Sequence, residues 1–170
     1  MYNYYRIENY WSIKMNIKKI DDFHWEIKTK NTKVIFNDGV KIGDFVVPGE
    51  GEYEVGGIEL ENFDGVYSFD IDGMQIVFIK KDKKNFSEKE MKKIGDIDLL
   101  FLPVDGEGTM DTKSALKLIS SIEPEIIIPT YYDNLLEFTK SEGVNAEEIA
   151  DLKISKNDLE DKQRKVYILK

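Results

Sequence analysis

The hydrophobic period changes between the first and second halves of the chain, and this change limits the folds that the sequence can adopt. In the first half, short segments rich in β-branched and aromatic residues alternate with turn formers, which predicts strands. In the second half, apolar runs alternate with segments of helical period. Strands first, followed by alternating strands and helices, indicate a layered α/β (α+β) fold with two sheets and helices outside.

The strands of the first half are predicted to begin at Met15. Asp72 and Gly73 lie between two alternating runs, which is typical of a type I′ hairpin turn. The predicted strands are MNIKKI (15–20), HWEIK (24–28), KVIF (33–36), DFVVP (44–48), EYEVGGIEL (52–60), GVYSFDI (65–71) and MQIVFIK (74–80).

Three helices are predicted in the second half. Ser87 and Glu90 form a capping box before the first helix, and Asp111 is the expected cap of the second. Asp133 is the expected cap of a third helix that stops at Gly143. Buried or closing strands are expected at LLFLPV (99–104), EIIIP (125–129), LKIS (152–155) and KVYIL (165–169).

The composition indicates one acidic domain. The chain has 170 residues, with 24 Lys and Arg against 33 Asp and Glu, a net charge of −9. Since no repeat or composition break divides it, we expect a single domain over residues 15–170 after a Tyr-rich N-terminal extension over residues 1–14. The acidic balance, without a basic stripe, argues against a nucleic-acid partner.

No segment of the sequence is typical of a membrane protein. No run approaches the roughly 20 apolar residues of a membrane span. The first residues also lack the apolar core and cleavage site of a signal peptide. We therefore expect no membrane association and a cytoplasmic location.

Cysteine and histidine counts exclude the commonest metal sites. The chain has no cysteine, and His24 is its one histidine, so thiolate sites and sites with two imidazoles are excluded. We interpret His24 as a structural or surface residue because no partner motif accompanies it. From residue chemistry alone we assign no catalytic residue.

Four segments, in order, carry a resemblance to one family. They are GEGEYEVGGIEL (49–60), FSEKEMKKIGDIDLLFLPVDGEGTMD (86–111), ALKLISSIEPEIIIPTYYD (115–133) and LKISKNDL (152–159). Together they resemble the small metallo-β-lactamase-fold proteins described as zinc-dependent hydrolases, related to the ascorbate-lactonase branch. This resemblance implies an αββα sandwich, here trimmed in its N-terminal half.

The sequence departs from that family where the resemblance implies metal ligands. The family's H-x-H-x-D-H motif has no counterpart, because only residues 39–45 separate the expected positions of its neighbours. The family's metal-bridging aspartate aligns with Lys81, beside Asp82, and its last ligand histidine aligns with Tyr131. Asp105 replaces the first glycine of the family's Pro-Val-Gly-Gly loop. Lysine repels dications, and a phenol ionises only near a pKa of about 10, so we expect neither zinc nor another cofactor.

Three functions follow from this comparison. The first, which we favour, is a non-catalytic binding or scaffolding relative of the hydrolases, with a protein partner or a homo-oligomer formed through sheet edges. The second is a metal-dependent hydrolase of phosphodiester, lactone or amide bonds with an atypical site made from Asp38, Asp82, Asp105 and His24. The third is a module that binds a small anionic ligand through Lys81, Lys83 and Tyr131. The candidate cleft residues are Lys81, Asp82, Asp105 and Tyr131.

Overall fold

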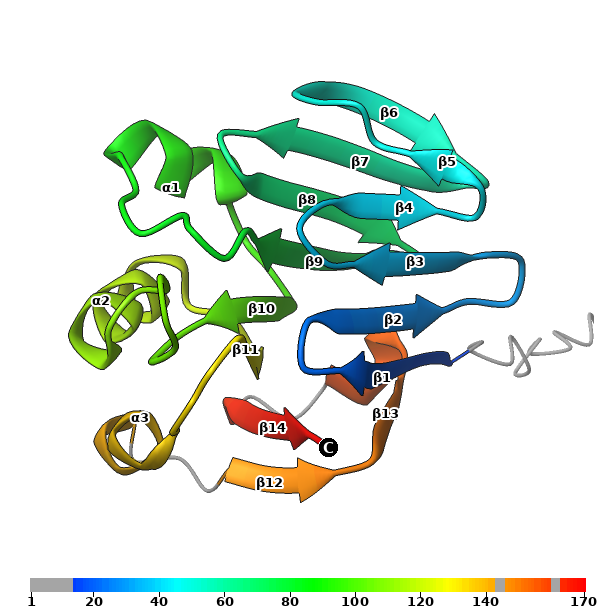
Figure 1. Cartoon of the computed structure of the whole chain (residues 1–170). Helices are drawn as coiled ribbons and strands as arrows, with labels where there is room; N and C mark the ends of the chain where they lie inside the picture. Colours follow the sequence, from blue (N-terminus) through cyan, green and yellow to red (C-terminus); the bar gives the residue numbers. More distant parts are fainter. Residues whose placement is uncertain (1–13, 143–145, 160–162) are drawn as a thin grey trace, which may run out of the picture.

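A computed structural model describes residues 14–142, 146–159 and 163–170, and its strands form two sheets packed face to face (Figure 1). The six-stranded sheet is antiparallel, in the order β13-β1-β2-β3-β4-β5. Its strands are β1 (Met15–Asp21), β2 (His24–Lys28), β3 (Lys33–Phe36), β4 (Val40–Ile42), β5 (Phe45–Val46) and β13 (Asp151–Ile154).

The eight-stranded sheet is mixed, in the order β12-β14-β11-β10-β9-β8-β7-β6. The strands from β6 to β9 are antiparallel, and those from β9 to β12 run parallel. They are β6 (Gly51–Val55), β7 (Ile58–Phe63), β8 (Val66–Ile71), β9 (Met74–Ile79), β10 (Leu99–Pro103), β11 (Ile126–Thr130), β12 (Ala146–Ile149) and β14 (Lys165–Leu169).

Turn residues set the hairpins of the first half. Asp72 and Gly73 have φ angles of 51° and 78°, as a type I′ turn requires, so the predicted hairpin between β8 and β9 is confirmed. The segment over residues 52–60 forms the hairpin of β6 and β7, because the turn formers Gly56 and Gly57 within it reverse the chain with φ angles of 59° and 78°. The short strands β4 and β12 were not predicted.

The second half supplies helices α1 (Glu88–Ile94), α2 (Thr112–Ile122) and α3 (Leu136–Glu142), and the 3₁₀ helix η1 (Lys156–Leu159) follows β13. The capping box of Ser87 and Glu90 is present, which confirms the start of α1. The side chain of Asp111 accepts from the N–H of Ser114 at 2.8 Å and caps α2 as predicted.

The predicted cap of the third helix is wrong. Asn134, rather than Asp133, accepts the N–H of Leu136, at 2.8 Å. The backbone N–H of Asp133 donates a hydrogen bond to the carbonyl of Asp105, so Asp133 lies against the loop after β10. The predicted stop at Gly143 lies outside the described residues.

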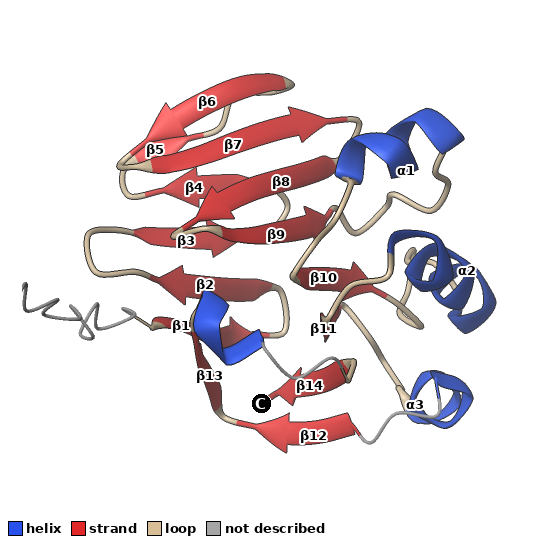
Figure 2. Cartoon of the chain, turned by 180° about the vertical axis from the view of Figure 1, so that it is seen from behind, coloured by secondary structure: helices blue, strands red, loops and turns tan. Residues whose placement is uncertain are grey.

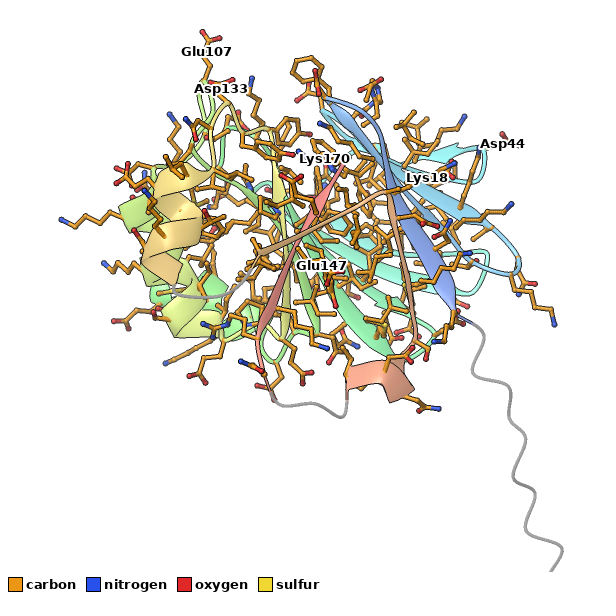
Figure 3. All side chains as sticks on the ribbon, turned by 90° about the horizontal axis from the view of Figure 1, so that it is seen from below. Lys18, Asp44, Glu107, Asp133, Glu147 and Lys170 are labelled. Carbon is orange, nitrogen blue, oxygen red and sulfur yellow. The ribbon has the colours of Figure 1, made fainter. Side chains whose placement is uncertain are left out.

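The helices and the two sheets form three layers (Figures 2 and 3). One apolar cluster fills the space between the sheets, and a second lies between the eight-stranded sheet and α1, α2 and α3. In the described ranges, no α-helix covers the outer face of the six-stranded sheet, whose strands β1 to β5 come from the N-terminal half. The layered α/β sandwich is confirmed, and the trimmed half lacks its outer helix layer within these ranges.

None of the described helices has the length and apolar character needed to cross a membrane.

Candidate functional site

The candidate site lies at one edge of the sandwich, where loops from both sheets meet. Because β9, β10 and β11 are parallel neighbours, their carboxyl ends share this edge, which is where open α/β sheets commonly bind ligands. Lys81 follows β9, Asp105 follows β10 and Tyr131 follows β11. Two turns of the six-stranded sheet reach the same edge and contact these loops through Phe23 and Asn37.

Tyr131 is buried between the two sheets. Its side chain packs edge-on against Trp25, with ring centroids 4.8 Å apart, and its hydroxyl donates to the carbonyl oxygen of Asn37 at 2.7 Å. Burial, with smaller contributions from Asp38 and Tyr67, raises the pKa of Tyr131 above its usual range. The phenol is therefore a neutral hydrogen-bond donor that holds the sheets together.

The backbone of the loops after β10 and β11 is strained and closely packed. Asp105 and Tyr131 have φ angles of 53° and 54°, a region that non-glycine residues rarely adopt. A Cβ on Gly106 would lie 1.7 Å from the carbonyl oxygen of Tyr131, so only glycine fits there. Such strain is concentrated at functional sites in proteins, which makes this edge the best candidate.

The carboxylate of Asp105 has a partner within its own loop. It accepts a hydrogen bond from the hydroxyl of Thr112, in the first turn of α2. The N–H of Gly106 donates a hydrogen bond to the hydroxyl of Thr109 at 2.8 Å, and this bond closes the loop. Asp105 is therefore held against α2 and is only half-buried.

Lys81, which follows β9, is one of the cations at this edge. Its Nζ lies 5.9 Å from the ring centroid of Phe23, and its Cε faces the loop at Gly108. Over the ranges that the structure describes, no carboxylate forms an ion pair with it. Asp82, the next residue, is exposed.

Two of the neighbouring lysines, Lys80 and Lys83, are already paired. Lys80 Nζ lies 3.8 Å from the carboxylate of Asp38. Lys83 pairs with Asp64 and Glu90. The predicted anion pocket of Lys81, Lys83 and Tyr131 is therefore reduced to Lys81, because Lys83 is neutralised and the Tyr131 hydroxyl is bonded to protein.

The donor set at this edge does not fit the zinc site that the resemblance implies. Zinc in proteins takes thiolate, imidazole and carboxylate ligands. At the two positions that the resemblance aligns with metal ligands, the chain has a lysine and a neutral phenol, and the carboxylates of Asp38 and Asp105 face Lys80 and Thr112. Among the described residues, no three His, Asp or Glu side chains group in a way that could hold a metal.

His24 lies on the β1–β2 hairpin, and its side chain contacts Asp21 of the same hairpin. Its Nδ1 is 2.6 Å from Asp21, whose pKa is lowered by hydrogen bonds from the N–H of Phe23 and from His24. The predicted makeshift site of Asp38, Asp82, Asp105 and His24 is not formed. The structure supports the interpretation of His24 as a structural residue.

Three functional contacts were missed by the sequence analysis. Asn37, Phe23 and Thr112 were not predicted to contact the candidate site residues. The pair of glycines in DGEGTMD is the one local signal that a close backbone approach occurs here, at Gly106.

Comparisons with known proteins agree with this architecture. The family model of the beta-lactamase superfamily domain matches residues 8–131, and so begins inside the predicted N-terminal extension. The chain belongs to this superfamily.

Two curated relatives match parts of the chain. A UPF0173 metal-dependent hydrolase of Thermococcus onnurineus is 33% identical over 106 residues, which cover 56% of this chain and 42% of that protein. One from Nanoarchaeum equitans is 38% identical over 68 residues, which cover 38% of this chain and 31% of that protein. The matched stretch thus spans less than half of each relative.

Solved structures share the fold at low sequence identity. A metallo-beta-lactamase superfamily protein from Thermotoga maritima superposes with a TM-score of 0.77 and 19% identity, covering 91% of this chain and 98% of that one. Igni18, a metallo hydrolase from Ignicoccus hospitalis, superposes with a TM-score of 0.60 and 12% identity, covering 92% and 95%. The chain therefore has the metallo-β-lactamase fold.

Proposed function

We propose that this protein is a non-catalytic member of its superfamily that folds without a metal and acts by binding. The observation that carries the proposal is the position of Tyr131, whose buried phenol donates to Asn37 where the resemblance implies a ligand histidine. A neutral phenol with a raised pKa is a poor zinc ligand, because a ligand must lose its proton.

The charges at the same edge of the sheet support the same proposal. Lys81 adds a fixed positive charge at the position aligned with a metal-bridging aspartate. At about 4 Å and an effective dielectric of about 20, each unit of like charge costs about 4 kcal/mol. Asp105, an alternative ligand in the loop after β10, accepts a hydrogen bond from Thr112.

Metal content and stability test the proposal directly. The untagged protein, purified without chelators and then offered zinc, manganese and iron, is expected to retain less than about 0.1 metal per chain after gel filtration. Its melting temperature is expected to be the same with and without EDTA, because nothing in the native state depends on a metal. The Thermococcus onnurineus relative, treated in parallel, is the positive control for metal loading.

Retention of about one or two metals per chain, together with chelator-sensitive hydrolysis, would overturn the proposal. That result would favour the metal-dependent hydrolase that the names of the relatives suggest. The assay would use phosphodiester, lactone and amide substrates, because these are the bonds that such a hydrolase is expected to cleave. A rate lost in Asp82→Ala would place Asp82 in the site.

A second candidate, anion binding, is supported by Lys81, which has no acidic partner among the described residues. Inorganic phosphate, nucleotides and small carboxylates are expected to raise the melting temperature of the wild-type protein but not of Lys81→Met. Lys84→Met, an exposed lysine in the same loop, is the matched control. Flat responses to all three ligand classes would reject this candidate.

We also infer a cytoplasmic location, which cell fractionation would test.

A further inference from the structure

The outer face of the six-stranded sheet is rich in lysine. Strand register places Lys18 in one row with Glu26 and Ile35, and places Lys28 opposite Lys33 in the next row. Residues directly opposite each other share a face of the sheet. The residues that alternate with them along each strand are buried in the core, so these side chains point away from it. Five lysines lie on this face: Lys18, Lys28, Lys33, Lys41 and Lys153.

Few carboxylates balance these lysines. Glu26, which is only 8% exposed, lies 3.5 Å from Lys18 Nζ and 3.6 Å from Lys33 Nζ. Asp151 is opposite Lys18. The face therefore carries a positive excess in a chain whose net charge is −9. We call this outer face of the six-stranded sheet the lysine face.

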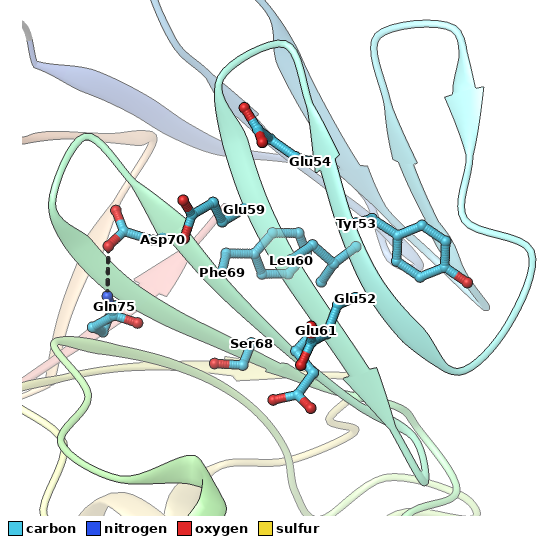
Figure 4. A pocket seen from close by; sticks show the side chains of 10 residues that line it. All are labelled: Glu52, Tyr53, Glu54, Glu59, Leu60, Glu61, Ser68, Phe69, Asp70 and Gln75. Atoms are coloured by element: carbon cyan, nitrogen blue, oxygen red, sulfur yellow. Dashed lines mark hydrogen bonds between the residues drawn. The ribbon is translucent and has the colours of Figure 1, made fainter.

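The eight-stranded sheet has the opposite pattern on the part of β6, β7 and β8 that α1 does not cover. Glu52 lies opposite Glu61, Glu54 lies opposite Glu59, and Glu59 lies opposite Asp70. Figure 4 shows these carboxylates, and we call the surface that carries them the carboxylate face. They line a pocket of about 560 Å³.

Like charges directly opposite each other destabilise a sheet. Within the described ranges, the one lysine that pairs with the carboxylate face is Lys93 of α1, which contacts Glu61. Most of the negative charge on this face therefore has no cation to oppose it.

The two faces point away from each other. The lysine face is the outer surface of one sheet, and the carboxylate face is on the helix side of the other, with the inter-sheet core between them (Figure 3). A molecule with opposite charges on opposite faces is complementary to a copy of itself in a head-to-tail arrangement. Such heterologous contacts repeat, and they form either rings or open chains.

We propose that the lysine face of one molecule docks on the carboxylate face of a second copy. A single contact then accounts for both unpartnered sheet faces. A basic protein would leave the lysine face unused, and a nucleic acid would meet the net negative charge of the chain. Ile35 and the exposed Val46, both on the lysine face, add apolar contact area.

Sedimentation velocity at two salt concentrations tests the proposal. At about 0.1 M salt the screening length is about 10 Å, so contact pairs persist while long-range repulsion is reduced, and at about 1 M it falls to about 3 Å. The wild-type protein is expected to show at least about twice the monomer mass at the lower salt concentration and to be monomeric at the higher one.

Two neutralised variants define the faces. Lys28→Gln/Lys33→Gln removes charge from the lysine face, and Glu54→Gln/Glu59→Gln removes charge from the carboxylate face. Each variant alone is expected to be monomeric at the lower salt concentration. An equal mixture is expected to form a dimer and nothing larger, because each variant keeps the face that the other lacks.

Matched controls change the net charge without touching either face. They are Lys113→Gln/Lys117→Gln on the exposed side of α2, and Glu137→Gln/Glu147→Gln on α3 and β12. Both are expected to associate like the wild-type protein. The proposal is overturned by a wild-type monomer at both salt concentrations, by face variants that still associate, by controls that do not, or by a mixture without a dimer.

Discussion

The hydroxyl of Tyr131 lies 2.7 Å from the carbonyl oxygen of Asn37, and this hydrogen bond joins the loop after β11 to the turn between β3 and β4. It links the two sheets at the edge where the loops of the candidate site meet. In the proposed function, a hydrogen bond between two residues of the chain takes the place of a bond to a metal. The stability of the fold should therefore depend on this phenol.

Removing the Tyr131 hydroxyl should destabilise the protein. Tyr131→Phe leaves the carbonyl of Asn37 without this partner, and a lost hydrogen bond at a buried site costs about 1–2 kcal/mol of unfolding free energy. Urea denaturation at neutral pH measures the change. Tyr132→Phe, at the next residue, keeps the ring that faces Lys19 and should change stability by less than about 0.5 kcal/mol. Equal effects of the two variants would contradict the role assigned to Tyr131.

The same phenol should make stability sensitive to alkaline pH. Since burial raises the pKa of Tyr131 in the folded state, the unfolded state loses its proton first, from a pKa of about 10. The contribution of this group is therefore complete below pH 10 and is lost as pH rises through the folded pKa. Denaturation between pH 8 and pH 11 should show a steeper loss for the wild-type protein than for Tyr131→Phe. Parallel slopes would refute this prediction.

Glu90 should contribute to stability mainly above mildly acidic pH. Its hydrogen bonds with Lys83, and then with Ser87, lower its pKa from 4.5 to about 2. Its contribution is present above the unfolded pKa and is lost as pH falls through the folded one. Glu90→Gln should cost roughly 1 kcal/mol at pH 7, and the difference from wild type should shrink between pH 5 and pH 2. Glu88→Gln, exposed in the same helical turn, is the control, and a pH-independent difference would argue against the mechanism.

Gly106 should tolerate no side chain. A Cβ there would lie 1.7 Å from the carbonyl oxygen of Tyr131, so Gly106→Ala must force apart the loops after β10 and β11. We expect a loss of at least about 2 kcal/mol, measured by thermal or urea unfolding. Gly49→Ala, where a Cβ meets nothing within 4 Å, should remain within about 0.5 kcal/mol of wild type. A stable Gly106→Ala protein would show that the two loops can separate.

Elements with a strong local pattern were predictable from the sequence. The caps at Ser87 and Asp111 and the turn at Asp72 depend on residues within a few positions of each other. The strands β4 and β12 were not predictable, because β4 has three residues and β12 is a polar segment that forms by pairing with β14. Their hydrogen bonds come from neighbours that only the folded chain provides.

The candidate site was predictable only in part. The resemblance drew attention to Lys81, Asp105 and Tyr131, and parallel strands place all three at one edge. Their partners could not be read from the sequence, since Tyr131 and Asn37 are 94 positions apart. Contacts of such separation depend on how the two sheets pack.

The sequence by itself determined the order of the longer strands and the helices, two of the three helix caps, the hairpin turns, and the absence of thiolate and multi-histidine sites, because each depends on residue type and near neighbours. Tertiary structure decided what the residues meet: the phenol of Tyr131 meets Asn37, and Lys81 meets an aromatic ring. It also separated the lysine face from the carboxylate face. Those faces depend on strand register, since a shift of one residue would turn each side chain to the other side of its sheet.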